Sequence, residues 1–329
     1  MHHLLHRRHV LGASLASLLG ASPLSALASE SYPTKPVHLI IPFPAAGATD
    51  YAGRAIGNSL SQAWRQPVVF DNRSGAGSTI GTEAGAKSAS DGYTLVMGVP
   101  AGISIAPHIY PKLGYDPLQD LVPVAGFATS PMVVVVPANS PFKTFKDMVN
   151  AAKAQPGKLT FASNGSGSLP HLASAWFETQ AKIELTHVPY RGSAQALPDL
   201  MAGRTDMMFD IIVSSLPLIE SGRLRALAIT SAQPSSRLPD VPTVASFGYP
   251  EFVADQWYGL FAPAHTPPAV VAKIEDDVRT ACLDTKLRAT MWQRGAEIRF
   301  SAAKLLTREV TRDHQRWKQV VALSGAKAE

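Results

Sequence analysis

The chain has 329 residues, of which 46% are hydrophobic and 17% are charged, and its formal net charge is +5. This composition is typical of a globular protein with a full core and excludes a disordered chain, while the length favours about two domains. Basic residues are scattered beyond the N-terminus, so binding of nucleic acid is not indicated. The single cysteine, Cys282, excludes an internal disulfide and a cysteine-based zinc site.

The first 29 residues have the three regions of a secretory signal peptide. Arg7-Arg8 precedes a mildly apolar run, LGASLASLLGASPLSALA, which is too short to form a stable membrane-spanning helix and ends in the cleavage signal Ala26-Leu27-Ala28. The arginine pair also suggests the twin-arginine pathway, although His6 and Val10 depart from its usual pattern. We therefore expect residues 1–29 to be removed on export to the periplasm, by either the Sec or the twin-arginine route.

Short apolar runs then alternate with helical patterns, which is the signature of α/β architecture with mostly parallel strands. The predicted strands are Val37–Ile41, Val68–Asn72, Tyr93–Val99, Met132–Val136, Leu159–Ala162, Leu185–Pro189, Asp206–Ile211 and Leu224–Thr230. The predicted helices include Tyr51–Trp64, Ile80–Ser88, Thr144–Ala154, Leu172–Thr179 and Ala194–Ala202.

Two segments resemble connections between lobes. VVVVPANSPFKTFKDM reads as a strand that leaves one lobe and enters another, and LRALAITSAQPSSRLPDVPTV runs from a strand into a Pro/Ser-rich link. We expect a discontinuous first lobe of residues 30–130 plus 240–329 and an inserted second lobe of residues 131–239.

Four glycine-bearing turns each follow a predicted strand and precede a predicted helix. They are Pro42 to Asp50, NRSGAGSTIGTEA, SNGSGSLPHLASAWF and VPYRGSAQALPDL. A turn of small residues that leads into a helix exposes unpaired backbone N–H groups at the positive helix end, which suits an anion. One such turn is most often a plain connection. Four together are notable because loops at the carboxyl ends of strands are where open α/β sheets bind ligands.

The sequence gives little support to catalysis. It contains neither the G-x-S-x-G nor the H-E-x-x-H motif, and the histidines after the leader lack metal-ligand spacing. Ser166 and His171 are close in sequence, but no orienting acid is suggested near them. His171 stands out because it begins a helix beside a Gly/Ser turn. We expect no enzyme activity, metal or cofactor.

Several polar residues allow two interpretations. Asp50, Asp206 and Asp210 could act as general bases, but helix capping and solvation of strand ends are the commoner roles. Arg191 could pair with an anion or lie exposed. The residues alone do not decide between these interpretations.

At a larger scale the sequence resembles a known family. The segments that carry the resemblance are YPTKPVHLIIPFPAAGATD, NRSGAGSTIGTEAGAKSASDGYTLVMG, IYPKLGYDPLQDLVPVAG, SNGSGSLPHLASAWF, VPYRGSAQALPDLMAGRTDMMFD and LPDVPTVASFGYPEF with WYGLFAPAHTPPAVVAKI. In order and over nearly the whole mature chain, they resemble the Bug family of periplasmic receptors of tripartite tricarboxylate transporters. The resemblance implies an α/β, two-lobed periplasmic-binding-protein fold with a cleft that closes on a small carboxylate.

The resemblance also implies a set of ligand-binding residues. Phe43 is expected as a cleft wall, and the other expected contacts are Ala45, Ala46, Gly47, Asp50, Gly77, Ser78, Thr79, Ser104, Asn164, Gly165, Ser166, Gly167, His171, Tyr190 and Asp210. The chain departs from the family pattern at Ala46, where Gly is usual, and at Ser246, where many members carry Glu. The segment PAGISIAPHIY stands where the family usually has a loop with Thr, His and Asn, so Ser104 is the main polar group that remains in it.

These observations predict a receptor, expected to be a monomer, that binds an organic acid or acidic amino acid and delivers it to a membrane permease of the tripartite tricarboxylate type. Two alternatives stay open. One is a sensory partner that presents its ligand to a membrane kinase. The other is a periplasmic hydrolase that uses Ser166 and His171.

Overall fold

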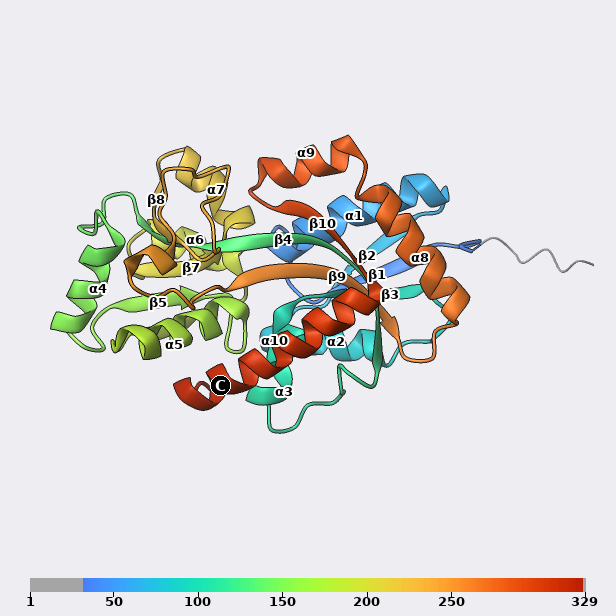
Figure 1. Ribbon diagram of the computed structural model, residues 1–329, viewed down its shortest axis with the longest axis horizontal. Helices are drawn as coiled ribbons and strands as arrows, with labels where there is room; N and C mark the ends of the chain where they lie inside the picture. The colour runs from blue at the N-terminus through green and yellow to red at the C-terminus, as the bar shows by residue number, and fades with distance from the viewer. Residues whose placement is uncertain (1–31, 328–329) are drawn as a thin grey trace, which may run out of the picture. The chain divides into compact units, whose positions relative to one another are not determined.

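A computed structural model of the chain describes residues 32–327, so the predicted signal peptide lies outside the described residues (Figure 1). Ten strands in this part of the chain form a sheet in the order β2-β1-β3-β9-β4-β7-β5-β6, and β8 and β10 also pair with β4. The strands are β1 (Val37–Ile41), β2 (Val68–Asn72), β3 (Thr94–Gly98), β4 (Leu121–Pro137), β5 (Thr160–Ser163), β6 (Thr186–Pro189), β7 (Met207–Ile211), β8 (Leu224–Ile229), β9 (Asp255–Pro263) and β10 (Glu297–Ala302).

The long strand β4 connects the two halves of this sheet. Its residues up to Pro131 pair with β9 and β10, whereas its residues from Met132 pair with β7 and β8. In Figure 1, β4 and β9 run side by side through the middle of the described chain. The change of partners falls near the predicted first crossing between lobes, but the lobe boundaries themselves stay a prediction.

The prediction of mostly parallel strands is wrong. β1 is parallel to β2 and β3, and β5 is parallel to β6 and β7, but β4 and β9 run antiparallel to every strand with which they pair. The helices that follow β1, β2, β5 and β6 impose parallel pairing locally, because a crossover connection returns the chain in the same direction. The strands that join the two halves are not linked by such crossovers.

Helices pack on both halves of the sheet. They are α1 (Ala48–Trp64), α2 (Thr79–Ala86), α3 (Ala106–Ile109), α4 (Phe145–Ala154), α5 (Leu169–Ala181), α6 (Ser193–Met201), α7 (Ile212–Glu220), α8 (Pro268–Ala281), α9 (Thr285–Gln293) and α10 (Ala303–Ser324), with short turns η1 (Ala76–Ser78), η2 (Ala101–Ile105) and η3 (Val244–Phe247). The C-terminal helix α10 contacts both β4 and α5, so the end of the chain packs against a helix from its middle.

The pattern of apolar residues explains the elements that position the site. β1 is buried at four of its five positions, as is usual for a central parallel strand. The chain turns after Ile41 and enters α1, which buries Ala52, Ile56 and Leu60 at a spacing of four residues. Gly57 on α1 leaves room for the Phe70 ring of β2, since a Cβ there would lie 2.5 Å from the ring. The first turn of α1 is therefore held at the carboxyl end of β1.

Within residues 32–327, no helix combines the length and apolar character that a membrane crossing requires. The same residues contain no group of three or more His, Cys, Asp or Glu side chains placed to hold a metal ion.

Candidate functional site

The loops that follow β1, β5 and β6 enclose a small cavity of about 20 Å³. This volume holds little more than one water molecule, so the loops lie close together at this point, which is referred to as the closed cavity. The lining residues come from both halves of the sheet and are Phe43, Pro44, Ala45, Gly47, Ala48, Thr49, Ala101, Asn164, Leu169, Pro170, Gly192, Ser193, Ala194, Ile211 and Gln256. Among these described residues, none is charged.

The N-terminal turns of three helices meet at this cavity. Ala48 and Thr49 begin α1, Leu169 and Pro170 begin α5, and Ser193 and Ala194 begin α6. The N–H groups of a first helical turn have no acceptor within the helix and lie at the positive end of its dipole. The caps of α1 and α6 are Gly47 and Gly192, which offer no side chain to these N–H groups. The cavity therefore has the electrostatics of an anion site without any cationic side chain.

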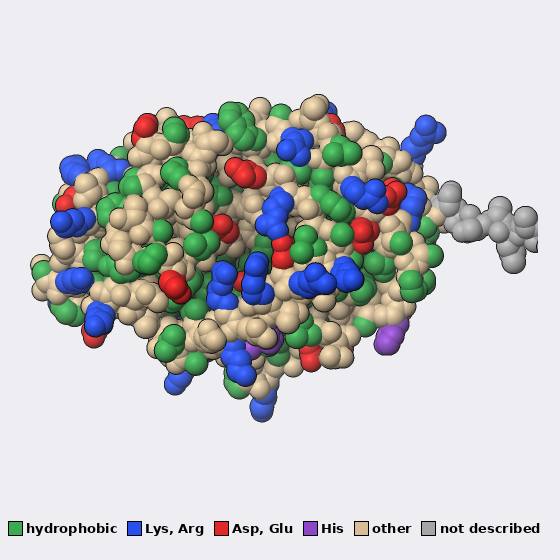
Figure 2. All heavy atoms as spheres, viewed as in Figure 1, with side chains coloured by type: hydrophobic (Ala, Val, Ile, Leu, Met, Phe, Trp, Pro, Cys, Tyr) green, Lys and Arg blue, Asp and Glu red, His purple; other side chains and the backbone are tan. Residues whose placement is uncertain are grey.

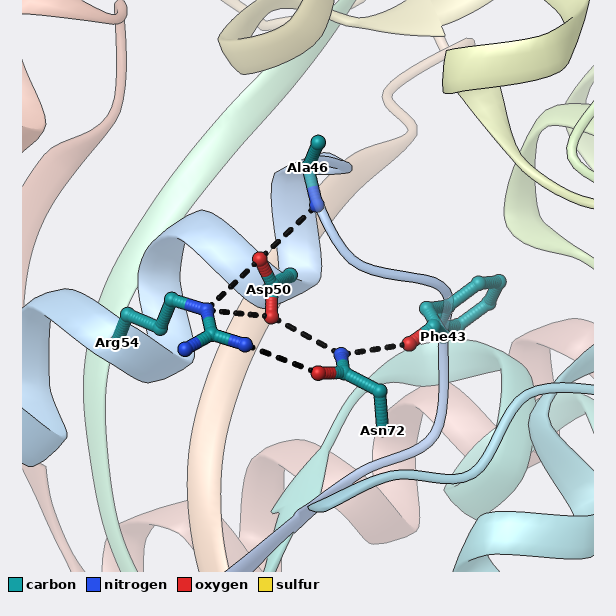
Figure 3. A network of polar contacts seen from close by, with 5 residues as sticks. All are labelled: Phe43, Ala46, Asp50, Arg54 and Asn72. Atoms are coloured by element: carbon teal, nitrogen blue, oxygen red, sulfur yellow. Dashed lines mark hydrogen bonds and ion pairs between the residues drawn. The ribbon is translucent and has the colours of Figure 1, made fainter. Parts of the chain in front are cut away.

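Asp50 holds the turn between β1 and α1 in shape (Figure 3). Its carboxylate accepts hydrogen bonds from the Ala46 N–H at 3.0 Å, from Arg54 Nε at 2.9 and 3.0 Å, and from Asn72 Nδ2 at 2.9 Å. Asn72 Nδ2 also donates to the Phe43 carbonyl at 3.0 Å, and Arg54 Nη2 donates to Asn72 Oδ1. Gly47 is the N-cap of α1, and Asp50 is the third residue of the helix. The Asp50 carboxylate therefore stabilises the turn without lining the closed cavity.

The pKa of Asp50 lies below its ordinary value. Burial opposes ionisation, but the hydrogen bonds from Arg54, Asn72 and the Ala46 N–H outweigh it. Ala46 itself adopts a φ of 64°, in the left-handed region that favours glycine.

A second, open pocket of about 690 Å³ lies where the loop after β2 faces the loop after β5. A Cβ on Gly77, whose φ is +59°, would lie 2.7 Å from the Ser166 carbonyl oxygen. The Tyr110 hydroxyl donates to that carbonyl at 3.1 Å. The two glycine turns thus approach within van der Waals distance, and Gly77 is the residue that permits it.

Two stacked histidines support the loop of residues 164–168 from inside. The His171 and His187 rings are parallel within 5° with centroids 4.1 Å apart, and His171 Nδ1 accepts from the Gly167 N–H at 3.1 Å. Ser163 Oγ accepts from the Gly165 N–H at 3.1 Å and lies 2.6 Å from His187 Nε2. Burial lowers the pKa of His187 to about 4, so the ring is neutral and its Nε2 can accept a hydrogen bond from the Ser163 hydroxyl. His171 lies among the supports of the loop, and it is not a lining residue of either pocket.

Asp210 lies directly behind the cavity lining. It is fully buried, and its Oδ1 is 2.7 Å from Ser193 Oγ, which in turn is 2.9 Å from Asn164 Oδ1. Burial raises the pKa of Asp210 to about 7, although hydrogen bonding, above all from Ser193, works in the opposite direction.

The structure brings most of the expected site residues to the two pockets. The expected residues that line the closed cavity or the larger pocket are Phe43, Ala45, Gly47, Gly77, Ser78, Asn164, Gly165, Ser166 and Tyr190. Ala46 and Asp50 line a neighbouring pocket of about 380 Å³ beside α1. Thr79, Ser104, Gly167, His171 and Asp210 line none of these three pockets. Ser104 is fully buried within η2, and the Thr79 hydroxyl donates to the Ala76 carbonyl.

Sequence reasoning missed the residues that begin the helices. The missed lining residues are Ala48, Thr49, Leu169, Pro170, Ser193 and Ala194, of which only Thr49 and Ser193 have polar side chains. Their signal was positional, since each directly follows a glycine-bearing turn. Of the residues left open, Arg191 lies exposed and lines the larger pocket, while Asp206 accepts from the N–H and hydroxyl of Thr160 at the start of β7. The face drawn in Figure 2 is hollowed near its middle, with Lys and Arg side chains gathered beside the hollow.

Solved structures of periplasmic binding proteins share this architecture. The periplasmic binding protein BugD matches with a TM-score of 0.86 and 31% identity, over 91% of this chain and all of that one. The structure of R. palustris Rpa4515 with adipate matches with a TM-score of 0.87 and 32% identity over the same shares. MatC from Rhodopseudomonas palustris with bound malate matches with a TM-score of 0.83 and 31% identity, over 88% of this chain and all of that one. The chain therefore has the two-lobed periplasmic-binding-protein fold, the class in which a ligand lies in a cleft between lobes.

Sequence comparisons narrow this class. The profile of the tripartite tricarboxylate transporter family receptor, TctC, matches residues 52–325. BugT of Bordetella pertussis is 35% identical over 97% of both chains. A UPF0065 protein from the tcbD-tcbE intergenic region of Pseudomonas sp. strain P51 is 39% identical over 96% of this chain and 94% of its own. The chain belongs to the TctC family, whose Bug members the sequence resembles.

Proposed function

We propose that this protein is an extracytoplasmic solute receptor that binds a small carboxylate in the interlobe cleft and delivers it to a tripartite tricarboxylate-type membrane transporter. The observation that carries the proposal is the meeting of the glycine-capped N-termini of α1 and α6, beside that of α5, at one cavity whose described lining has no charged side chain. The related structures with adipate and malate support a carboxylate as the ligand class.

The chemistry of the cavity suits a carboxylate. Each hydrogen bond from a backbone N–H or hydroxyl to an ionised carboxylate contributes about 1.5–3 kcal/mol net. Thr49 and Asn164 add polar side chains to the N–H groups of α1 and α6. Phe43 and Leu169 supply apolar walls, which would cover the hydrocarbon part of an organic acid.

Binding also requires the cleft to open and close. The closed cavity admits about one water, so a carboxylate would enter an open form and the lobes would then close over it. Closure removes water and strengthens the hydrogen bonds to the charged group. On this proposal, residues 30–130 plus 240–329 move as one lobe and residues 131–239 as the other, and the chain crosses between them within β4 and again near residue 239. Location in the periplasm follows from the proposed signal peptide and from the family.

A thermal-shift screen of unfolded and refolded protein tests the proposal. Refolding removes any ligand that co-purifies, and the panel contains adipate, malate, succinate, citrate, aspartate and glutamate. A ligand present at a hundred times its dissociation constant adds about 2.7 kcal/mol to the free energy of unfolding, which is several degrees for a protein of this size. The result that contradicts a carboxylate receptor is a folded protein whose melting temperature no carboxylate raises. Turnover of an ester or amide that Ser166→Ala abolishes would instead favour the hydrolase.

A further inference from the structure

The Ser193 hydroxyl lies between two oxygen atoms but has only one proton. Its Oγ is 2.7 Å from Asp210 Oδ1 and 2.9 Å from Asn164 Oδ1. One O–H group can donate to only one of them. If both contacts are hydrogen bonds, either Asp210 carries a proton and donates to Ser193, or the Asn164 amide turns its NH₂ group toward Ser193.

These two arrangements present opposite groups to the cavity. With Asp210 protonated, Ser193 donates to Asn164 Oδ1, and the Asn164 NH₂ is left to the cavity that this residue lines. With Asp210 ionised, Ser193 donates to Asp210 and the turned Asn164 amide leaves its oxygen to the cavity. The first arrangement offers a donor to a ligand carboxylate, whereas the second offers an acceptor, which would repel a carboxylate and attract an ammonium group. Within residues 32–327, Asn164 Nδ2 makes no hydrogen bond.

The surroundings of Asp210 favour the protonated form. The residue is fully buried, and its Oδ2 has no hydrogen-bond partner among the described residues. An ionised carboxylate with one oxygen unpartnered in the interior is costly, while the same oxygen in a neutral carboxyl group costs much less.

No charged side chain from the elements around Asp210 offsets this cost. Val133 of β4 pairs with it in the sheet, and Ser193 Oγ of α6 lies 2.7 Å from its Oδ1. Ser215 of α7 lies nearby, but its hydroxyl has no hydrogen-bond partner among the described residues. Tyr258 of β9 is a titratable neighbour, and the Asp210 charge helps to raise its pKa. The pKa of Asp210, raised to about 7 by burial, agrees with this geometry.

We propose that Asp210 is a specificity-determining residue that takes up a proton when a carboxylate binds, and that through Ser193 and Asn164 this proton sets the cavity to donate hydrogen bonds. The inference rests on the proposed function, and it states which protonation state of the same site binds a carboxylate. Asp210 is a positioning residue, because it acts on the ligand through Ser193 and Asn164. The proton comes from solvent, so carboxylate binding weakens as the pH rises above the pKa of Asp210 in the free receptor.

Calorimetric titration at pH 6.5 and 8.5 tests the inference, with adipate and malate as the probes. For the wild-type protein, the dissociation constant is expected to rise at least about tenfold between the two pH values, up to a limit of one decade per pH unit. Titrations at pH 8.5 in two buffers of different ionisation enthalpy should show uptake of close to one proton for each ligand bound.

Two variants and a control complete the experiment. Asp210→Asn cannot titrate, and its amide can donate to Ser193, so its two dissociation constants should agree within about twofold. Ser193→Ala disconnects Asp210 from Asn164 and should also remove the pH dependence, even if Asp210→Asn fails to fold. Asp206→Asn makes the same chemical change in the same half of the sheet, outside the three pockets, and should retain the wild-type dependence.

The outcomes separate this inference from the proposed function. Wild-type protein that binds a probe equally at both pH values, without proton uptake, overturns the inference and leaves the carboxylate receptor in place. A pH dependence that persists in Asp210→Asn or in Ser193→Ala overturns it as well, because another group then titrates. Failure of every probe to bind at pH 6.5 overturns the proposed function, and the inference falls with it.

Discussion

Asp50 shows how a charged residue can shape an anion site without touching the anion. Its carboxylate holds the Ala46 N–H, Arg54 and Asn72 on the far side of the turn between β1 and α1. A negative charge so close to an anion site would be unfavourable if Arg54 did not neutralise it. The residue thus contributes rigidity, and the ion pair limits its effect on the potential of the cavity.

Asp50→Ala is therefore expected to lower the free energy of unfolding by about 2 kcal/mol at pH 7, because it removes the buried carboxylate that accepts the hydrogen bonds of Ala46, Arg54 and Asn72. The folded-state pKa of Asp50 is depressed, so this contribution is present above the unfolded pKa and is lost as the pH falls through the folded pKa. Urea unfolding of wild-type and variant protein should show the difference at pH 7 and a smaller one below about pH 4. Asp71→Ala, which removes an exposed ion pair with Arg73, should change stability by no more than about 0.5 kcal/mol.

Gly77 provides a second test at the scale of single residues. A methyl group at this position would meet the Ser166 carbonyl across the cleft. Gly77→Ala should therefore weaken binding of the carboxylate found in the thermal-shift screen by at least about tenfold. A collision that makes closure of the cleft about 1.4 kcal/mol less favourable is enough for this change. Gly157→Ala has a similar φ of +69° and open space around it, so it carries the same backbone strain without the collision. Equal affinities of the two variants in calorimetry would show that these turns do not approach each other on binding.

At the scale of elements, a substitution in the first turn of α6 can test the stability of the helix and the binding of an anion separately. Ala194 is the second residue of α6, is exposed and lines the closed cavity. An acidic side chain in the first turn stabilises a helix by about 0.3–1 kcal/mol. The same charge would compete with the ligand for the N–H groups of that turn.

Ala194→Asp should therefore leave the melting temperature of the free protein unchanged or slightly raised while it weakens carboxylate binding at least about tenfold. Ala269→Asp makes the same change at the second residue of α8, which is exposed and outside the three pockets. Ala269→Asp should change the melting temperature as little as Ala194→Asp does, and its affinity for the carboxylate should equal that of the wild-type protein. If both variants bind as wild type does, α6 does not form part of the anion site.

The same scale shows what the sequence can predict. The predicted strands Val37–Ile41 and Val68–Asn72 are β1 and β2 to the residue. Burial explains the signal of β1, whereas β2 is half-buried and was predicted from its β-branched and aromatic residues. The first part of β4 was missed since Pro123 and Pro131 argue against an inner strand. Pro123 stands at an irregularity in the pairing with β9, and Pro131 at the change of partners, so the prolines mark where the strand bends.

The strands near the C-terminus, β9 and β10, were missed for a different reason. β10 alternates exposed and half-buried residues in its first four positions, so its apolar signal is weak. β9 is defined by its position between β3 and β4, and that long-range pairing has no local signature. For the site, glycine turns could be predicted to gather, but the cavity lining of Ala48, Ser193 and Ala194 depends on how the two halves of the sheet close.

At the scale of the whole molecule, Arg237 links the chain after β8 to α9. Its Nη1 donates to the carbonyls of Trp292 and Gln293 at 3.3 and 2.9 Å, its guanidinium lies 4.5 Å from the Trp292 ring centroid, and it pairs with Glu220. On the proposed lobe boundaries, Arg237 belongs to the second lobe and α9 to the first. The contact would then stabilise the closed form alone.

Arg237→Ala is expected to speed ligand dissociation by about five- to tenfold, which is about 1–1.4 kcal/mol, as measured by stopped-flow release. Arg223→Ala removes an exposed arginine of the same lobe, whose side chain donates a hydrogen bond to Ser221. The ligand should therefore dissociate from this variant at the wild-type rate. An unchanged rate in Arg237→Ala would indicate that this contact persists in the open form, and it would count against the proposed boundary near residue 239.

The central claim is that a carboxylate binds to the N–H groups of helices that meet at the cleft. Amide nitrogen and proton chemical shifts of refolded, isotopically labelled protein test it most directly, recorded with and without the best carboxylate of the thermal-shift screen. The account predicts that the largest shifts fall on Gly47, Ala48, Thr49, Ser193 and Ala194, and that the neutral diamide of the same acid causes none of them. Saturable shifts confined to other parts of the chain, with these five amides unchanged, would contradict it.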